Sequence, residues 1–170
     1  MAYRTKTYIA ADWSGDKDAV DKLYEWKDSK YWSLTFTNAH DLTQARDSSL
    51  NCSIKDSLAI RLDVSKTFVL IVGNGTKDLR NGGCQYCDSY NSHTYRCARG
   101  HSVDYRSYIE YECAKAVRDK LKIAVLYNAA TVDKSKCPDV IKSEGTHVAM
   151  CYKKDGKYYW DYQAVKNVID

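Results

Sequence analysis

The segment 36–49 holds a high density of side chains that can bind or transform a ligand. Its sequence, FTNAHDLTQARDSS, brings an imidazole, a guanidinium, two carboxylates and several amides together. Arg46 could hold a phosphate through two hydrogen bonds, and Asp41 or Asp47 could accept hydrogen bonds from ribose hydroxyls. As alternatives, the two aspartates cap turns and the following helix, and His40 is a hydrogen-bonded residue at the edge of a sheet.

A second group of reactive side chains lies in a long polar segment at about 74–103. Cys84 and Cys87 form a Cys-x-x-Cys pair, and Cys97 and His101 follow them at a spacing that suits zinc ligands. A connection of this length is uncommon without structure of its own, and a closed structural zinc site would pin it. Reduced thiols, or a disulfide formed on oxidation, are the alternative.

The elements that must position these groups follow from the hydrophobic period, which switches between two and about 3.6 residues and predicts βαβ units. The expected strands span residues 6–11, 32–37, 67–72, 121–126 and 146–152. The expected helices span residues 16–27, 53–64, 104–120 and 159–169, and Pro138 is expected to open a short one. The strand over 67–72 is continuously apolar, as a strand covered on both faces should be, and is the expected centre of the sheet.

The carboxyl ends of parallel strands face one edge of a sheet, and the crevice at that edge is the expected binding site. The residues that leave the first, second, third and fourth strands are polar: Asp12 and Ser14; Asn38, His40 and Asp41; Gly73 and Asn74; and Asn128. Any one of them could simply form a turn or cap a helix. Their coincidence at one edge favours a binding site.

Length, charge and composition limit the class of protein. A chain of 170 residues is expected to form one domain, 1–170, with one core. The formal net charge of +4 comes from scattered basic residues, so it does not indicate a nucleic-acid or membrane partner. The first residues lack the apolar segment of a secretory signal and no apolar run could span a bilayer, so we expect a cytoplasmic protein. Its seven cysteines are then thiols or metal ligands.

Three stretches together carry a family resemblance. They are the segment 36–49, the pattern SKxFVLIVGxxT over 65–76, and the pair Tyr111-Glu112 in the expected 104–120 helix. Together they resemble the TIR-like proteins of the Thoeris anti-phage defence system, most specifically over 38–49 and weakly beyond Asn128. The resemblance implies a single flavodoxin-like TIR domain: a central parallel sheet flanked by helices, with the Cys/His-rich loop of about 74–103 inserted between the third strand and the catalytic helix.

The resemblance also implies an activity. Known members cleave NAD at the nicotinamide–ribose bond and make a signalling nucleotide derived from ADP-ribose, here expected to be cyclic, which activates a separate effector protein. The family's catalytic glutamate falls on Glu112. The expected substrate-binding residues are Asp12, Asn38, His40, Asp41, Arg46, Asp47, Gly73, Tyr105 and Tyr108. NAD and the effector are the expected partners, a homo-oligomer is compatible with them, and neither nucleic acid nor a membrane is expected.

The sequence departs from the family pattern in two places. The first strand ends Ile-Ala-Ala-Asp over 9–12 where many TIR domains have Phe-x-Ser, and the insertion separates the third strand from the catalytic helix.

The role of Glu112 can also be inferred from its position in the expected helix, without the family resemblance. On a helical projection it borders an apolar stripe that includes Ile109 and lies on the side of Tyr105 and Tyr108. Cleavage of the bond between ribose and nicotinamide builds positive charge on the sugar, and a fixed carboxylate beside the ribose would stabilise that charge. Alternatively, Glu112 pairs with Lys115 on the helix surface, which the spacing permits.

Two other functions fit the same sequence. One is a non-enzymatic TIR-like module that binds a nucleotide or assembles with partners, because a fold alone does not secure chemistry. The other is a different ribosyl-transferring enzyme, in which a carboxylate acts on nucleosides. Release of the base from NAD or from nucleosides separates these functions.

Overall fold

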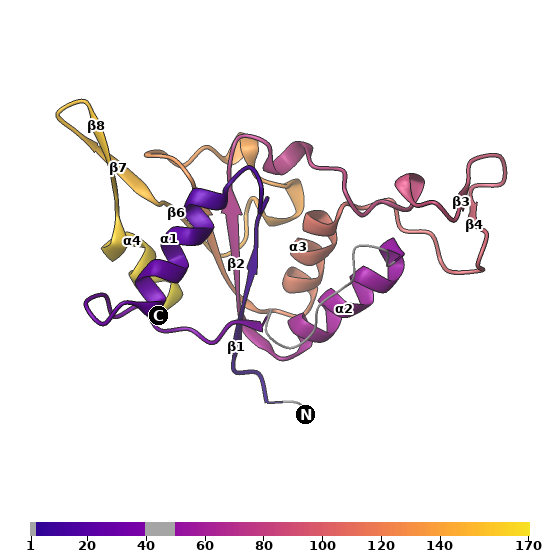
Figure 1. Cartoon of the computed structure of the whole chain (residues 1–170), viewed down its shortest axis with the longest axis horizontal. Helices are drawn as coiled ribbons and strands as arrows, with labels where there is room; N and C mark the ends of the chain where they lie inside the picture. The colour runs from indigo at the N-terminus through magenta and orange to yellow at the C-terminus, as the bar shows by residue number, and fades with distance from the viewer. Residues whose placement is uncertain (1–2, 40–49) are drawn as a thin grey trace.

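The computed structural model describes residues 3–39 and 50–170. Its centre is a parallel sheet with the strand order β1–β2–β5–β6 (Figure 1). The strands are β1 (Lys6–Ala10), β2 (Ser65–Val72), β5 (Lys122–Tyr127) and β6 (Thr146–Ala149). The continuously apolar β2 pairs with β1 on one side and β5 on the other, as its sequence predicted. An α/β fold with a central parallel sheet is therefore confirmed.

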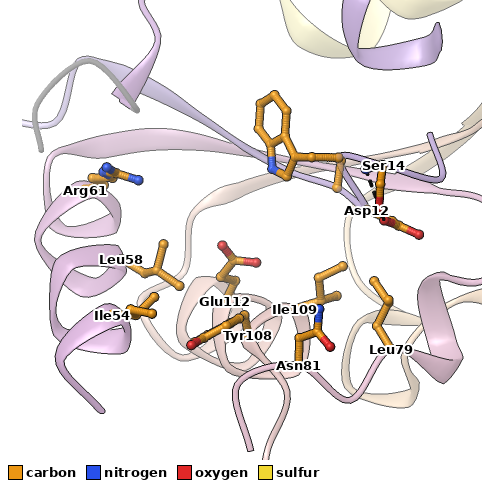
Figure 2. Close-up of a pocket in the computed structure, with 12 residues that line it drawn as sticks. Asp12, Ser14, Ile54, Leu58, Arg61, Leu79, Asn81, Tyr108, Ile109 and Glu112 are labelled. Atoms are coloured by element: carbon orange, nitrogen blue, oxygen red, sulfur yellow. Dashed lines mark hydrogen bonds between the residues drawn. The ribbon is translucent and has the colours of Figure 1, made fainter. Parts of the chain in front are cut away.

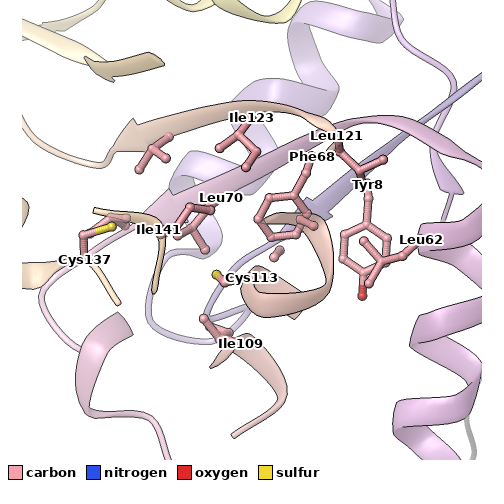
Figure 3. Close-up of a cluster of buried hydrophobic side chains, with 14 of the residues drawn as sticks. Tyr8, Leu62, Phe68, Leu70, Ile109, Cys113, Leu121, Ile123, Cys137 and Ile141 are labelled. Atoms are coloured by element: carbon pink, nitrogen blue, oxygen red, sulfur yellow. The ribbon is translucent and has the colours of Figure 1, made fainter. Parts of the chain in front are cut away.

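Helices cover both faces of this sheet. Helices α1 (Lys17–Asp28) and α4 (Tyr162–Ile169) lie on one face, and α2 (Asn51–Asp63) and α3 (Tyr108–Arg118) lie on the other (Figure 1). Successive side chains of a strand point to opposite faces. Phe68 and Leu70 of β2 accordingly pack toward α2 and α3 (Figure 3), and Val69 packs toward α1 and α4. The chain thus buries two cores, one on each face.

The predicted strand over 32–37 is wrong. This segment reaches β1 only at its end, where the Thr7 amide donates to the Thr37 carbonyl at 2.7 Å beside a single bridge to Asn38. Earlier in the segment, the Ser33 amide donates to the Tyr162 hydroxyl at 2.8 Å, and Trp32 packs on the Tyr162 ring. The side chains of α4 therefore hold backbone that the alternating pattern assigned to the sheet.

Three other boundaries differ from the prediction. Helix α3 begins at Tyr108 rather than at 104, because Ser107 caps it. The predicted strand over 146–152 divides at the buried Met150 into β6 and β7 (Cys151–Lys154). The predicted helix over 159–169 begins only at Tyr162, since the preceding residues form β8 (Lys157–Trp160), which pairs with β7 in a projecting hairpin (Figure 1).

The segment between β2 and α3 contains short elements. They are η2 (Thr76–Asp78), η3 (Cys84–Tyr86), β3 (Tyr90–Asn91) and β4 (Arg96–Cys97). Strands β3 and β4 pair in an antiparallel hairpin that projects away from the sheet (Figure 1). After β5 follow η4 (Lys134–Lys136) and η5 (Asp139–Ile141), the latter opened by Pro138 as predicted. Within 3–39 and 50–170, no helix is long and apolar enough to cross a membrane.

Candidate functional site

A cavity of about 670 Å³ lies between the carboxyl end of β1, helix α2 and helix α3 (Figure 2). We call it the α2–α3 cavity. Its volume is within the range of small-molecule sites, which are mostly apolar with a few fixed polar groups. The lining follows that composition: Ala11, Asp12, Trp13, Ser14, Ile54, Leu58, Arg61, Leu79, Asn81, Tyr108, Ile109 and Glu112.

Glu112 is the central polar group of this cavity. Figure 2 shows its carboxyl directed from α3 into the cavity, with Leu58 on one side and Ile109 on the other. The residue is only 6 % exposed. Its Oε1 accepts a hydrogen bond from the hydroxyl of Tyr8, which reaches it from β1. The carboxyl therefore has a fixed orientation.

The surroundings of Glu112 also change its acidity. Burial raises the pKa of this carboxyl from its ordinary value of 4.5 to about 7, although the hydrogen bond from Tyr8 and the charge of Arg61 act in the opposite direction. Arg61 comes from α2 and is itself buried at the cavity wall. A carboxyl with a pKa near neutrality inside a cleft is typical of functional sites.

The alternative in which Glu112 pairs with Lys115 is wrong. The Lys115 ammonium lies 2.6 Å from Asp63 and 2.7 Å from Asp119, so it joins the end of α2 to the end of α3. The Glu112 carboxyl points into the cavity instead (Figure 2).

Asp12 lines the opposite end of the cavity, after β1. Its Oδ1 accepts hydrogen bonds from the Ser14 amide at 3.3 Å, the Ser14 hydroxyl at 3.1 Å and the Gly15 amide at 3.1 Å. Asp12 therefore both stabilises the turn into α1 and lines the cavity.

The polar strand exits do not all meet in one place. The Asn128 amide after β5 donates to Asp16 at 3.0 Å and to Asp18 at 2.9 Å. Gly73 after β2 packs against the Asp16 carboxylate so closely that a Cβ there would not fit. Asp16, Gly73 and Asn128 thus connect the ends of β1, β2 and β5 beside the cavity. Neither Gly73 nor Asn128 lines the cavity itself.

The structure brings together only part of the predicted site. Asp12, Tyr108 and Glu112 line the cavity. Asn38 is instead buried and donates to the Tyr24 hydroxyl. Tyr105 is 50 % exposed, shares a hydrogen bond with the hydroxyl of Tyr90 in the β3–β4 hairpin, and does not line this cavity. The predicted residues His40, Asp41, Arg46 and Asp47 lie outside the described residues.

The four predicted zinc ligands line a separate small cavity. Cys84, Cys87, Cys97 and His101 surround it together with Cys52 of α2. The described part of the chain nevertheless contains no group of three His, Cys, Asp or Glu side chains that could hold a metal ion. The zinc site stays a prediction.

Sequence reasoning missed Tyr8, Trp13, Arg61 and Asn81 as site residues. A signal existed for two of them. Tyr8 lies two residues before Ala10, so both side chains are on the face of β1 that packs toward α2 and α3. A tyrosine on that face brings a hydroxyl toward the helix that carries Glu112. Arg61 lies directly before the inward-facing Leu62, so a long cation was predictable at the border of the apolar face of α2.

The parallel α/β sheet, with a buried carboxyl in a cleft beside the carboxyl end of β1, is consistent with a TIR-like domain. In the comparison with protein families, residues 8–81 match the family model described as Thoeris protein ThsB, TIR-like domain. The resemblance stated from the sequence is confirmed over this part of the chain. The match contains the end of β1 and all of α1, α2 and β2, and α3 with Glu112 lies beyond it. No curated protein gave a significant match.

Proposed function

We propose that this protein is an anti-phage defence enzyme that cleaves NAD at the bond between nicotinamide and ribose. The ADP-ribosyl product, closed into a cyclic nucleotide, would diffuse to a separate effector protein and activate it. The match to the ThsB TIR-like domain supports the role in Thoeris defence. The NAD chemistry rests on one observation, the buried Glu112 carboxyl directed into the α2–α3 cavity.

The chemistry follows from the charge of the substrate. When the bond between ribose and nicotinamide breaks, its electron pair goes to the pyridinium nitrogen, and nicotinamide leaves as a neutral base. Positive charge then develops on the ribose, as in glycoside cleavage. The ionised Glu112 carboxylate would stabilise that charge most strongly in the transition state, because the cavity around it is mostly apolar.

The second half of the reaction needs an acceptor for the ribosyl group. Attack by a nitrogen or oxygen of the same ADP-ribosyl unit forms a new bond to the ribose carbon and closes a ring. Attack by water gives ADP-ribose instead. In either case the acceptor loses a proton, which the Glu112 carboxylate can take.

The decisive variant is Glu112→Gln, which keeps the shape of the side chain and removes its charge. Nicotinamide release from NAD, followed by chromatography, should fall by about 10²-fold or more, because a charge-stabilising group of this kind contributes on that scale. Affinity for NAD should change little.

Glu110→Gln is the matched control on the same helix. Glu110 accepts a hydrogen bond from the Ser107 amide in the capping box of α3, and glutamine can accept the same bond. This variant should release nicotinamide at the wild-type rate. Full activity in Glu112→Gln, in a protein that consumes NAD, would contradict the assignment of the catalytic carboxylate.

The same assay separates the other two functions. Base release from nucleosides but not from NAD indicates a different ribosyl-transferring enzyme. Absence of both reactions would indicate a non-enzymatic module or an enzyme that rests until infection. Mass spectrometry of small molecules from infected cells that express wild type or Glu112→Gln distinguishes these, since only an enzyme makes a nucleotide that the variant lacks.

We also propose that the second, small cavity holds a structural zinc ion. Four thiols and one imidazole face this cavity, and they come from both the insertion and α2. Binding would require four of these side chains to converge on the metal. Purified protein should then contain about one equivalent of zinc, and Cys84→Ala should lower both the zinc content and the melting temperature. Metal-free wild-type protein that melts at the same temperature with and without added zinc would contradict this proposal.

A further inference from the structure

The buried hydroxyl of Tyr8 donates a hydrogen bond to the Glu112 carboxyl. It is fully buried in the middle of β1, and its ring stacks on Phe68 of β2 at a centroid distance of 5.8 Å (Figure 3). The stacked ring cannot turn without disturbing the core. The hydroxyl therefore meets the Glu112 carboxyl from a fixed direction.

Tyr8 can act only as a donor in this contact. Burial raises the pKa of its phenol well above the ordinary value of 10.0, and the neighbouring Glu112 carboxylate raises it further. The hydroxyl therefore stays protonated at neutral pH. Its hydrogen bond consequently stabilises the ionised form of Glu112 more than the neutral form.

Few other groups act on this carboxyl. Arg61 of α2 supplies a positive charge that lowers the pKa of Glu112. On α3 itself, the adjacent thiol of Cys113 is buried, which keeps its pKa well above the ordinary value and leaves it uncharged. Within the part of the chain that the structure describes, Tyr8 and Arg61 are thus the groups that oppose the effect of burial on the Glu112 charge.

We propose that Tyr8 is a positioning residue, which holds the Glu112 carboxyl ionised and directed into the cavity where ribose would develop positive charge. The proposal rests on the function proposed above, because it assigns Tyr8 a task in the same reaction. Tyr8 acts through Glu112 and does not itself line the cavity. A neutral Glu112 would offer no charge to the developing cation, so loss of Tyr8 should cost activity most where Glu112 is closest to protonation.

The test is the pH profile of kcat/KM for NAD cleavage in Tyr8→Phe. This variant keeps the stacked ring and removes only the hydroxyl. The acid limb of the profile should move to higher pH by about one unit, the size expected for loss of one hydrogen bond to a charged group. Activity at pH 6 should fall about tenfold, and at pH 9 it should return to within about twofold of wild type.

Tyr127→Phe is the matched control. Tyr127 is equally buried, on β5, and its hydroxyl shares a hydrogen bond of 2.9 Å with His147 rather than with Glu112. The acid limb of Tyr127→Phe should coincide with that of wild type. Incorporation of 3-fluorotyrosine at position 8, a stronger donor, should move the limb in the opposite direction from Tyr8→Phe.

Carbon NMR of the labelled Glu112 carboxyl gives a readout that needs no activity. Its titration midpoint should rise in Tyr8→Phe and stay at the wild-type value in Tyr127→Phe. An unchanged midpoint in folded Tyr8→Phe overturns the role of Tyr8. Failure of the proposed function has a different signature, a protein in which the midpoint moves as expected while Glu112→Gln and wild type make the same products from NAD.

Discussion

The Glu112 side chain should reduce the stability of the folded protein at neutral pH. Its folded pKa of about 7 lies above the ordinary value of 4.5, so the folded state prefers the protonated form. The favourable contribution of that form is complete below about pH 4.5 and is lost as the pH rises through 7. At higher pH the protein keeps an ionised carboxyl in a buried position.

Glu112→Gln should therefore be more stable than wild type above pH 7. The shift corresponds to at most about 3 kcal/mol in the free energy of unfolding. Thermal melts at pH 5 and pH 8 measure this: the two proteins should melt close together at pH 5, and the variant should melt several degrees higher at pH 8. Glu110→Gln, which changes the same functional group in the helix cap, should show no such divergence. Equal melting temperatures of Glu112→Gln and wild type at pH 8 would mean that the carboxyl is not held at an unfavourable pKa.

At the scale of elements, prediction from sequence succeeded where the local pattern of apolar residues decided the structure. The elements β1, α1, α2, β2 and β5 were predicted from continuous apolar runs, alternation or four-residue spacing, and each lies within about two residues of its predicted range. The segment over 32–37 has the same alternation, yet most of it does not pair with β1. Its backbone and Trp32 are held by Tyr162, a residue 129 positions after Ser33, which a local pattern cannot reveal.

The sequence at the start of α3 contains a helix-start signal that the prediction from the apolar period did not use. Ser107 and Glu110 form a capping box, in which the Glu110 amide donates to the Ser107 hydroxyl at 3.1 Å and the Ser107 amide donates to the Glu110 carboxylate at 2.9 Å. A serine followed three residues later by glutamate marks a helix start. The apolar period alone extended the helix back to 104. The correct start places Tyr108 in the first turn, where it lines the cavity.

Part of the candidate site could be predicted from local sequence patterns. Glu112 and Tyr108 lie on one helix, so their common face follows from the helical period. The contact between Tyr8 and Glu112 joins residues 104 positions apart and depends on how α3 packs on β1. The local pattern therefore predicts the face that Glu112 and Tyr108 share, but it does not predict the contact between Tyr8 and Glu112.

At the scale of the whole molecule, one buried cation joins α2 to the segment that leads from the insertion into α3. Lys55 of α2 is 4 % exposed. Its ammonium donates to the Arg106 carbonyl at 2.7 Å and to the Asp104 carbonyl at 3.3 Å, and it lies 3.5 Å from the Asp104 carboxylate. Burial opposes ionisation of Asp104, but hydrogen bonds from Arg106 and the charge of Lys55 lower its pKa to about 2.

This junction also supports the wall of the α2–α3 cavity. The Tyr108 amide donates to the Asn81 carbonyl at 2.7 Å, and the Tyr108 hydroxyl donates to Asn51 of α2 at 3.2 Å. Asn51 in turn donates to the Gly83 carbonyl at 3.0 Å. The cavity therefore keeps its shape only while α2, α3 and the start of the insertion stay together.

Replacing Lys55 with Met should loosen all three parts at once. The change keeps a long apolar stem but leaves two partly buried carbonyls without their donor and the Asp104 carboxylate with Arg106 alone. We expect a cost of about 2 kcal/mol or roughly 4–8 °C in melting temperature. Because the cavity wall shifts while Glu112 and Tyr8 remain, KM for NAD should rise more than kcat falls. Lys66→Met on β2, the same change at an exposed position, should alter neither stability nor kinetics. If the two variants melt at the same temperature, Lys55 does not hold α2 to the insertion; if Lys55→Met loses stability but keeps the wild-type KM, the junction supports the fold and not the cavity.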